Sequence, residues 1–208
     1  MHNQLLIVLF STFFCVSAWA RGLEVLNMAS PKLREFLIAH PAALQSLTNI
    51  LSRAFAERTA VLYYFYSENE STARAAHYYP SDSDVGITIR ENQQPADEFI
   101  CLVFEVLNSE SQKLFQELIR KAESGTISRS DFAQEMLRVE FKAAQGTRDL
   151  LGTFRLSKRE ISKSHFYKRV DGTPKRFEDF LAYTKMICAP ERDPFAEYEA
   201  KYDSLRKR

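Results

Sequence analysis

This chain of 208 residues has few histidines (four), cysteines (three) and tryptophans (one). It also has only six glycines and seven prolines. No Gly-rich phosphate loop follows a predicted strand, so nucleotide binding has no support. The serine-hydrolase elbow Gly-x-Ser-x-Gly and the dithiol pair Cys-x-x-Cys do not occur. The formal net charge is +1, so the overall charge gives no reason to expect binding to nucleic acid or to a membrane surface.

The rest of the composition is that of an ordinary globular protein, 45% hydrophobic and 26% charged. This length suits one compact domain with a full core, or one domain with a helical appendage. We divide the chain into a signal peptide (1–20), a single globular domain (21–190) and a charged, helical C-terminal tail (191–208).

The first 20 residues have the pattern of a secretory signal peptide. Leu5 to Val16 is almost continuously apolar, and Ala18-Trp19-Ala20 follows with the small-x-small pattern of a cleavage site. The apolar run is too short for a comfortable membrane span, so we expect a secreted or periplasmic protein with no span in its mature chain. An uncleaved anchor is the alternative, because the extreme N-terminus carries only its amino group as positive charge.

The number of cysteines is compatible with an exported protein, but it does not determine whether they form a disulfide. If Cys15 leaves with the signal peptide, Cys101 and Cys188 remain. A disulfide between them would close a long loop and stabilise the fold. Two buried thiols are the alternative, because Cys101 lies in an apolar run where a free cysteine packs well.

Three segments have the composition of strands: Thr59–Ser67, Arg74–Tyr79 and Val85–Arg90. In the last, Val85, Ile87 and Ile89 alternate with other residues, which predicts a half-buried strand at a sheet edge. The other segments have helical spacing. We therefore expect an α+β fold, mainly helical, with a small sheet of about three strands packed beside a buried central helix.

Helix boundaries are marked by capping residues, prolines and glycines. These signals are Ser30-Pro31 at a start, His40-Pro41 between two helices, Pro95 at a start, Gly125 at an end, Ser128 with Asp131 at a start, and Gly146 at an end or interruption.

The helix that begins at Pro95 is apolar on most sides, which predicts a core helix, and Glu105 is the one carboxylate inside its apolar run. The order of strand, turn and apolar helix, followed by a second helix with Glu140, resembles the zincin metallopeptidases. In that family a His-Glu-x-x-His helix and a downstream glutamate bind zinc, and the first glutamate is the general base. The resemblance aligns Glu105 with the base and Glu140 with the third ligand.

Both histidine positions of the resemblance hold other residues, because Phe104 and Asn108 stand where the family has its first two zinc ligands. Phenylalanine has no lone pair to donate, and a neutral amide oxygen is a poor zinc ligand. We therefore expect no metal and no cofactor. If zincin ancestry is absent, Glu105 can be a buried carboxylate paired with Arg138 or a backbone amide, and Glu140 can face solvent.

Two functions remain open. The first is an exported, non-catalytic binding module on a degenerate zincin-like domain. Its basic stretch Arg155–Arg176 could face an acidic protein or surface, although such stretches are more often solvated faces. The second is a hydrolase that uses Glu105 and Glu140 as an acid/base pair without zinc. A pocket containing both carboxyl groups favours the hydrolase, and a filled core around Phe104 favours the binding module.

Overall fold

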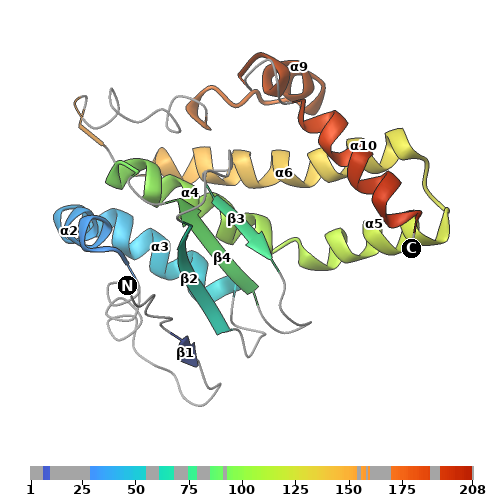
Figure 1. Cartoon of the computed structure of the whole chain (residues 1–208). Coiled ribbons are helices and arrows are strands. Elements are labelled where there is room, and N and C mark those ends of the chain that lie inside the picture. Colours follow the sequence, from blue (N-terminus) through green and yellow to red (C-terminus); the bar gives the residue numbers. More distant parts are fainter. Residues whose placement is uncertain are drawn as a thin grey trace.

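The computed structural model of this chain describes residues 7–9, 29–54, 61–67, 75–78, 85–90, 93–153, 156–157, 159, 170–187 and 193–207. Seven helices and four strands lie in these segments (Figure 1). The helices are α2 (Pro31–Ala39), α3 (Pro41–Ala54), α4 (Pro95–Ser109), α5 (Gln112–Ser124), α6 (Arg129–Leu151), α9 (Phe177–Ile187) and α10 (Pro194–Leu205). The strands are β1 (Ile7–Leu9), β2 (Val61–Ser67), β3 (Ala75–Tyr78) and β4 (Val85–Arg90).

The four strands form one mixed sheet in the order β1-β2-β4-β3. β2 and β4 run parallel, with Leu62 opposite Val85, whereas β1 pairs with β2 and β3 with β4 in antiparallel fashion. The expectation that β4 is an edge strand is wrong, because it has a hydrogen-bonded neighbour on each side. Periodicity shows which residues alternate, but not how many neighbours a strand has.

The expected α+β class, with its sheet of about three strands, is corrected by the structure. The described chain is mainly helical, and its seven helices supply most of the buried side chains. From the sheet, Ile87 and Ile89 are the side chains described as buried, and the strands number four. The physical reason is that the apolar faces of the helices bury each other, so the core depends mainly on helix packing rather than on the short strands.

The helix boundaries follow the local signals in most places. The Ser30 hydroxyl accepts a hydrogen bond from the Leu33 amide, and α2 begins at Pro31. His40 caps the end of α2 before α3 begins at Pro41. Gly125 ends α5 with a φ of 74°, a left-handed conformation that suits glycine. These predicted boundaries are confirmed.

Gly146 was expected to end or interrupt a helix, and this expectation is wrong. α6 continues through Gly146 to Leu151, and Gly152 caps its end. A Cβ atom at position 146 would lie 3.2 Å from Cδ1 of Leu107 on α4. The missing side chain therefore lets α4 approach α6 closely, and packing between the two helices outweighs the low helix propensity of glycine.

α4 is the buried centre of the fold. It packs against α2, α3, α6 and the strands β3 and β4, as Figure 1 shows. Phe99, Ile100, Cys101, Val103 and Val106 are fully buried in its core. Such an environment excludes water, so a charged side chain on this helix needs a specific partner.

The N-terminal segment predicted as a signal peptide contributes β1 to the sheet of the whole chain. Ala18-Trp19-Ala20 lies outside the described residues, so cleavage there stays a prediction. Within the described part of the chain, no helix is long and apolar enough to span a bilayer.

Candidate functional site

Glu105 is a charged residue in the interior of the fold, with a relative exposure of 7%. It shares one face of α4 with Glu98 and Asn108, because residues three, four and seven apart lie on the same side of a helix. These three polar side chains are all buried and make a polar stripe along a helix whose other buried residues are mostly apolar. The sequence showed the carboxylate at position 105 but not this stripe.

Glu140 lies in the middle of α6, on the face that also carries Met136 and Ala144. Met136 and Ala144 are buried, and Glu140 is half-buried beside them. The alternative of a fully solvated Glu140 is therefore excluded. α10 packs closely along α6 and also contacts α5 (Figure 1).

Tyr198 on α10 contacts Glu140 and lies within the electrostatic range of Glu105. Its hydroxyl group donates a hydrogen bond to Oε1 of Glu140. Burial raises the pKa of Tyr198 well above its ordinary value of 10.0, and the charge and hydrogen bond of Glu140 add to this shift. The charges of Glu105 and Glu197 raise that pKa further. The neutral phenol thus bonds to Glu140 and lies within electrostatic range of Glu105.

Lys201 is a cation near Glu140. It follows Tyr198 by one turn of α10, and Glu140 lies close enough to favour its charged form. Burial opposes this effect and is the larger influence, so the pKa of Lys201 is lowered, although part of the side chain is exposed. The site therefore combines two carboxylates, an ammonium group and a phenol held in its neutral form.

Phe104 lies next to Glu105 in a filled aromatic cluster rather than in a cleft. Its ring packs against the cluster of Leu137, Phe141, Ala144, Phe177 and Phe180, with Phe195 and Tyr198 at the border. The rings of Phe141 and Phe180 lie 5.0 Å apart, a normal separation for packed aromatic side chains. Apolar groups thus pack against the half-buried ring at the position where the resemblance places the first zinc ligand.

Asn108, at the position of the second zinc ligand, is buried with a relative exposure of 3%. Its Oδ1 atom has no hydrogen-bond partner among the described residues. In those residues, no group of three or more His, Cys, Asp and Glu side chains is arranged to hold a metal ion. The donor set around Glu105 therefore does not fit zinc, which needs at least three protein ligands in a catalytic site.

Arg138 is the residue that the sequence offers as a partner for Glu105, and the structure gives it other contacts. Its Nε atom pairs with Oε1 of Glu135 at 3.2 Å, and its guanidinium group lies 4.1 Å from the ring centre of Phe177. A groove of about 260 Å³ runs beside it between α5 and α6 and contains neither Glu105 nor Glu140. Its lining residues are Leu114, Glu117, Leu118, Lys121, Ile127, Glu135, Arg138, Val139 and Lys142.

Two other predicted features lie partly outside the described residues. Cys101 is buried, and its thiol donates a long hydrogen bond of 3.7 Å to Oε1 of Gln93. Cys188 is not among the described residues, so a Cys101–Cys188 disulfide stays a prediction. Most of the basic stretch Arg155–Arg176 is also outside them, although Lys175 and Arg176 are described and exposed.

Comparisons of this chain with protein-family models, curated proteins and solved structures found no match. The zincin resemblance therefore rests on the sequence pattern around Glu105 and Glu140 alone.

Sequence reasoning missed two residues of this site, Tyr198 and Lys201, and for Tyr198 a signal could have been found. A signal was present, because Phe195, Tyr198 and Tyr202 lie on one side of the helical C-terminal segment. Aromatic residues on one face predict that a helix packs against the domain, and a buried tyrosine hydroxyl needs a hydrogen-bond partner. The identity of that partner depends on which face of which helix receives α10.

Proposed function

We propose that this protein is an exported, non-catalytic binding module, built on a degenerate zincin-like domain. The observation that carries the proposal is the hydrogen bond from Tyr198 to Glu140, with Glu105 in electrostatic range of the same phenol. A catalytic carboxylate must reach a substrate atom or a water molecule. Here a side chain of the protein itself occupies that position.

The packing of Phe104 supports the same proposal. A filled core around this residue is the feature expected of a binding module, and the half-buried Phe104 ring packs against the ring cluster that includes Phe141, Phe177 and Phe180. The groove between α5 and α6 does not contain the two carboxylates. A substrate would have to displace Tyr198 of α10 before it could bind the Glu140 oxygen that the phenol occupies.

The second candidate is a hydrolase with Glu105 and Glu140 as an acid/base pair. The proximity of both side chains to Tyr198 favours this reading, because it places two carboxylates and a proton donor at one site. It requires solvent and substrate to enter beneath α10. The two candidates thus differ in whether a substrate can reach the two carboxylates.

Zinc titration tests the ancestry. The purified protein should contain no stoichiometric zinc after dialysis, because Phe104 and Asn108 cannot coordinate it. The double variant F104H/N108H restores His-Glu-x-x-His and should gain zinc affinity. Adding Glu140→Gln to the double variant should remove that gain. No zinc binding by a folded double variant would show that the resemblance is accidental.

A hydrolase panel tests the activity. The wild type, Glu105→Gln and Glu140→Gln should show the same background with peptide, ester and glycoside substrates. Glu135→Gln is the matched control, because Glu135 lies on α6 and pairs with Arg138 at the surface. An activity of the wild type that both site variants lose and Glu135→Gln keeps would overturn the proposal in favour of the hydrolase.

The proposed partner is an acidic protein or surface that meets the basic stretch Arg155–Arg176. Arg159, Lys175 and Arg176 are its described, exposed basic members, and the last two are adjacent. The charge reversal K175E/R176E should therefore weaken retention on immobilised polyglutamate at low ionic strength. The matched control is K113E/R120E, which reverses two exposed cations on α5. Equal loss in both double variants would indicate a general charge effect rather than this surface.

A further inference from the structure

α10 contacts the rest of the fold mainly through one face of the helix. Phe195, Tyr198, Tyr202 and Leu205 pack on the clusters formed by α5, α6 and α9, yet none of the side chains of α10 is fully buried. Beneath it, Phe132 and Met136 of α6 are almost completely buried. An amphipathic helix therefore lies over an apolar surface of other helices, as in complexes where a groove binds a helical peptide.

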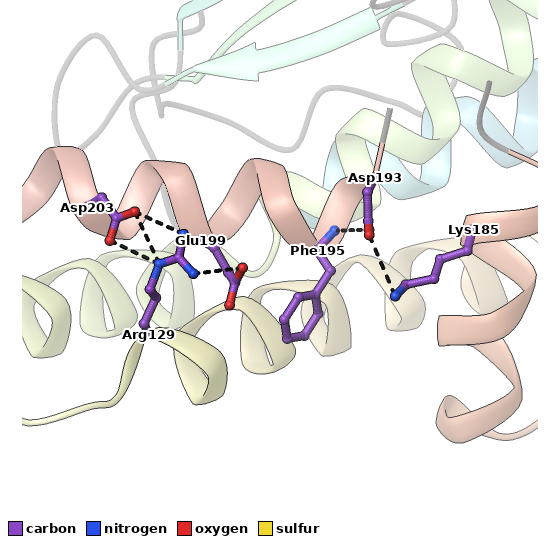
Figure 2. A network of polar contacts seen from close by, with 6 residues as sticks. All are labelled: Arg129, Lys185, Asp193, Phe195, Glu199 and Asp203. Carbon is purple, nitrogen blue, oxygen red and sulfur yellow. Dashed lines mark hydrogen bonds and ion pairs between the residues drawn. The ribbon is translucent and has the colours of Figure 1, made fainter. Parts of the chain in front are cut away.

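Arg129 is the main polar anchor of α10. It is the first residue of α6 and reaches two carboxylates of α10, as Figure 2 shows. Its Nε and Nη2 atoms bind Asp203 with contacts of 3.0 Å each, and its Nη1 atom lies 2.9 Å from Glu199. The Arg129 and Asp203 side chains are 48% and 44% exposed, so dissolved salt can screen this contact.

Further polar contacts lie at the two ends of α10. At its start, the Asp193 carboxylate accepts from the Phe195 amide and lies 3.6 Å from the Lys185 ammonium (Figure 2). Toward its end, the Tyr202 hydroxyl donates to the Ile127 carbonyl, and the Arg206 guanidinium donates to the Glu123 carbonyl. Because several of these groups are exposed, local opening of α10 can occur without unfolding of the core.

We infer that α10 is a detachable clasp, which binds its own chain as an amphipathic helix and covers the carboxylate site when it is docked. Its opening separates Tyr198 from Glu140 and uncovers the apolar surface around Phe132 and Met136. The open surface then binds a helix with the chemistry of α10. That helix has apolar or aromatic residues at the spacing of Phe195, Tyr198, Tyr202 and Leu205, and carboxylates at the positions of Glu199 and Asp203.

The clasp goes beyond the proposed function, because a binding module and a hydrolase could both be covered by it. Zinc titration and the hydrolase panel test the proposed function. Amide hydrogen exchange of the full chain tests whether α10 opens independently of the rest of the fold. The variant E199A/D203A removes both carboxylates that bind Arg129. Arg176→Ala is the control, because this exposed arginine pairs with Glu178 and Asp179 on α9.

E199A/D203A should raise the exchange rates of the α10 amides about three- to tenfold, since exposed ion pairs contribute modestly. α4 and α6 should keep wild-type rates, and Arg176→Ala should change neither. Added sodium chloride should have the same selective effect on the wild type, which gives a test even if the double variant does not fold. Exchange of α10 at the same rate as α4 and α6 under all these conditions would overturn the clasp.

A labelled synthetic peptide of residues 193–207 tests the surface beneath α10. It should bind E199A/D203A more tightly than the wild type, because the helix of the variant competes less while Arg129 remains available. Adding Arg129→Ala to the variant should weaken peptide binding, and a peptide with Tyr198 and Tyr202 replaced by alanine should not bind. Equal binding of both peptides, or no binding to a folded E199A/D203A, would count against an exchangeable helix.

Discussion

The hydroxyl group of Tyr198 donates a hydrogen bond to the carboxylate of Glu140, and this contact joins the C-terminal helix α10 to the middle of α6. Glu105 of α4 lies within electrostatic range of the same hydroxyl. Three helices that are distant in sequence therefore contribute to one polar site.

Tyr198→Phe should destabilise the fold more than Tyr202→Phe. Both variants lose one hydroxyl of α10, but Tyr198 donates to a carboxylate and Tyr202 to the Ile127 carbonyl. Hydrogen bonds to charged groups contribute about 1.5–3 kcal/mol, and those between neutral groups contribute about 0.5–1.5 kcal/mol. Urea denaturation measures the two losses. A loss in Tyr202→Phe as large as that in Tyr198→Phe would contradict the assigned role of Glu140.

The raised pKa of Tyr198 should make the protein sensitive to alkali. Unfolded Tyr198 ionises near its ordinary value of 10.0, whereas the folded protein keeps the proton to higher pH. The contribution to stability is thus fully present below that value and is lost as pH rises through the raised pKa. Unfolding free energies measured from about pH 9 to about pH 11 should fall less steeply in Tyr198→Phe. Identical slopes of unfolding free energy against pH in the two proteins would contradict the raised pKa of Tyr198.

Phe104→Ala should leave a cavity in the aromatic cluster of α4, α6 and α9. Phe104 is half-buried, so we expect a loss of about 2–4 kcal/mol, near the lower end for aromatic truncations. Phe132→Ala is a suitable reference, because Phe132 is fully buried and should cost about 3–5 kcal/mol. Thermal or urea unfolding gives both values. A neutral Phe104→Ala would mean that the former ligand position is not filled by this ring.

Ser128→Ala should weaken the start of α6. The Ser128 hydroxyl accepts from the Asp131 amide at 3.1 Å, which is the contact of a helix N-cap, and donates to the Asp131 carboxylate at 2.7 Å. Loss of such a cap costs about 1 kcal/mol. Ser130→Ala, an exposed change two residues later, should stay within about 0.5 kcal/mol of the wild type. Equal effects in the two variants would show that the cap does not stabilise α6.

Local signals predicted the helix boundaries well because a cap depends on residues a few positions apart. Ser30, Gly125 and Ser128 act where the sequence placed them. Gly146 was misjudged because its role depends on Leu107, a residue of another helix. The predicted fold class is wrong for a related reason. Alternation of apolar residues marks a strand but does not show how much of the core the sheet supplies.

The sequence by itself determined that α4 is apolar with a single carboxylate in its apolar run, that the zinc-ligand positions hold Phe104 and Asn108, and that α10 has an aromatic side. These properties depend on residue type and helical period. Only the tertiary structure decided that Glu105 and Glu140 share the environment of Tyr198, and that Arg129 binds α10 through Glu199 and Asp203. The reason is that helix crossing determines which side chains meet, and packing over the whole chain determines how helices cross.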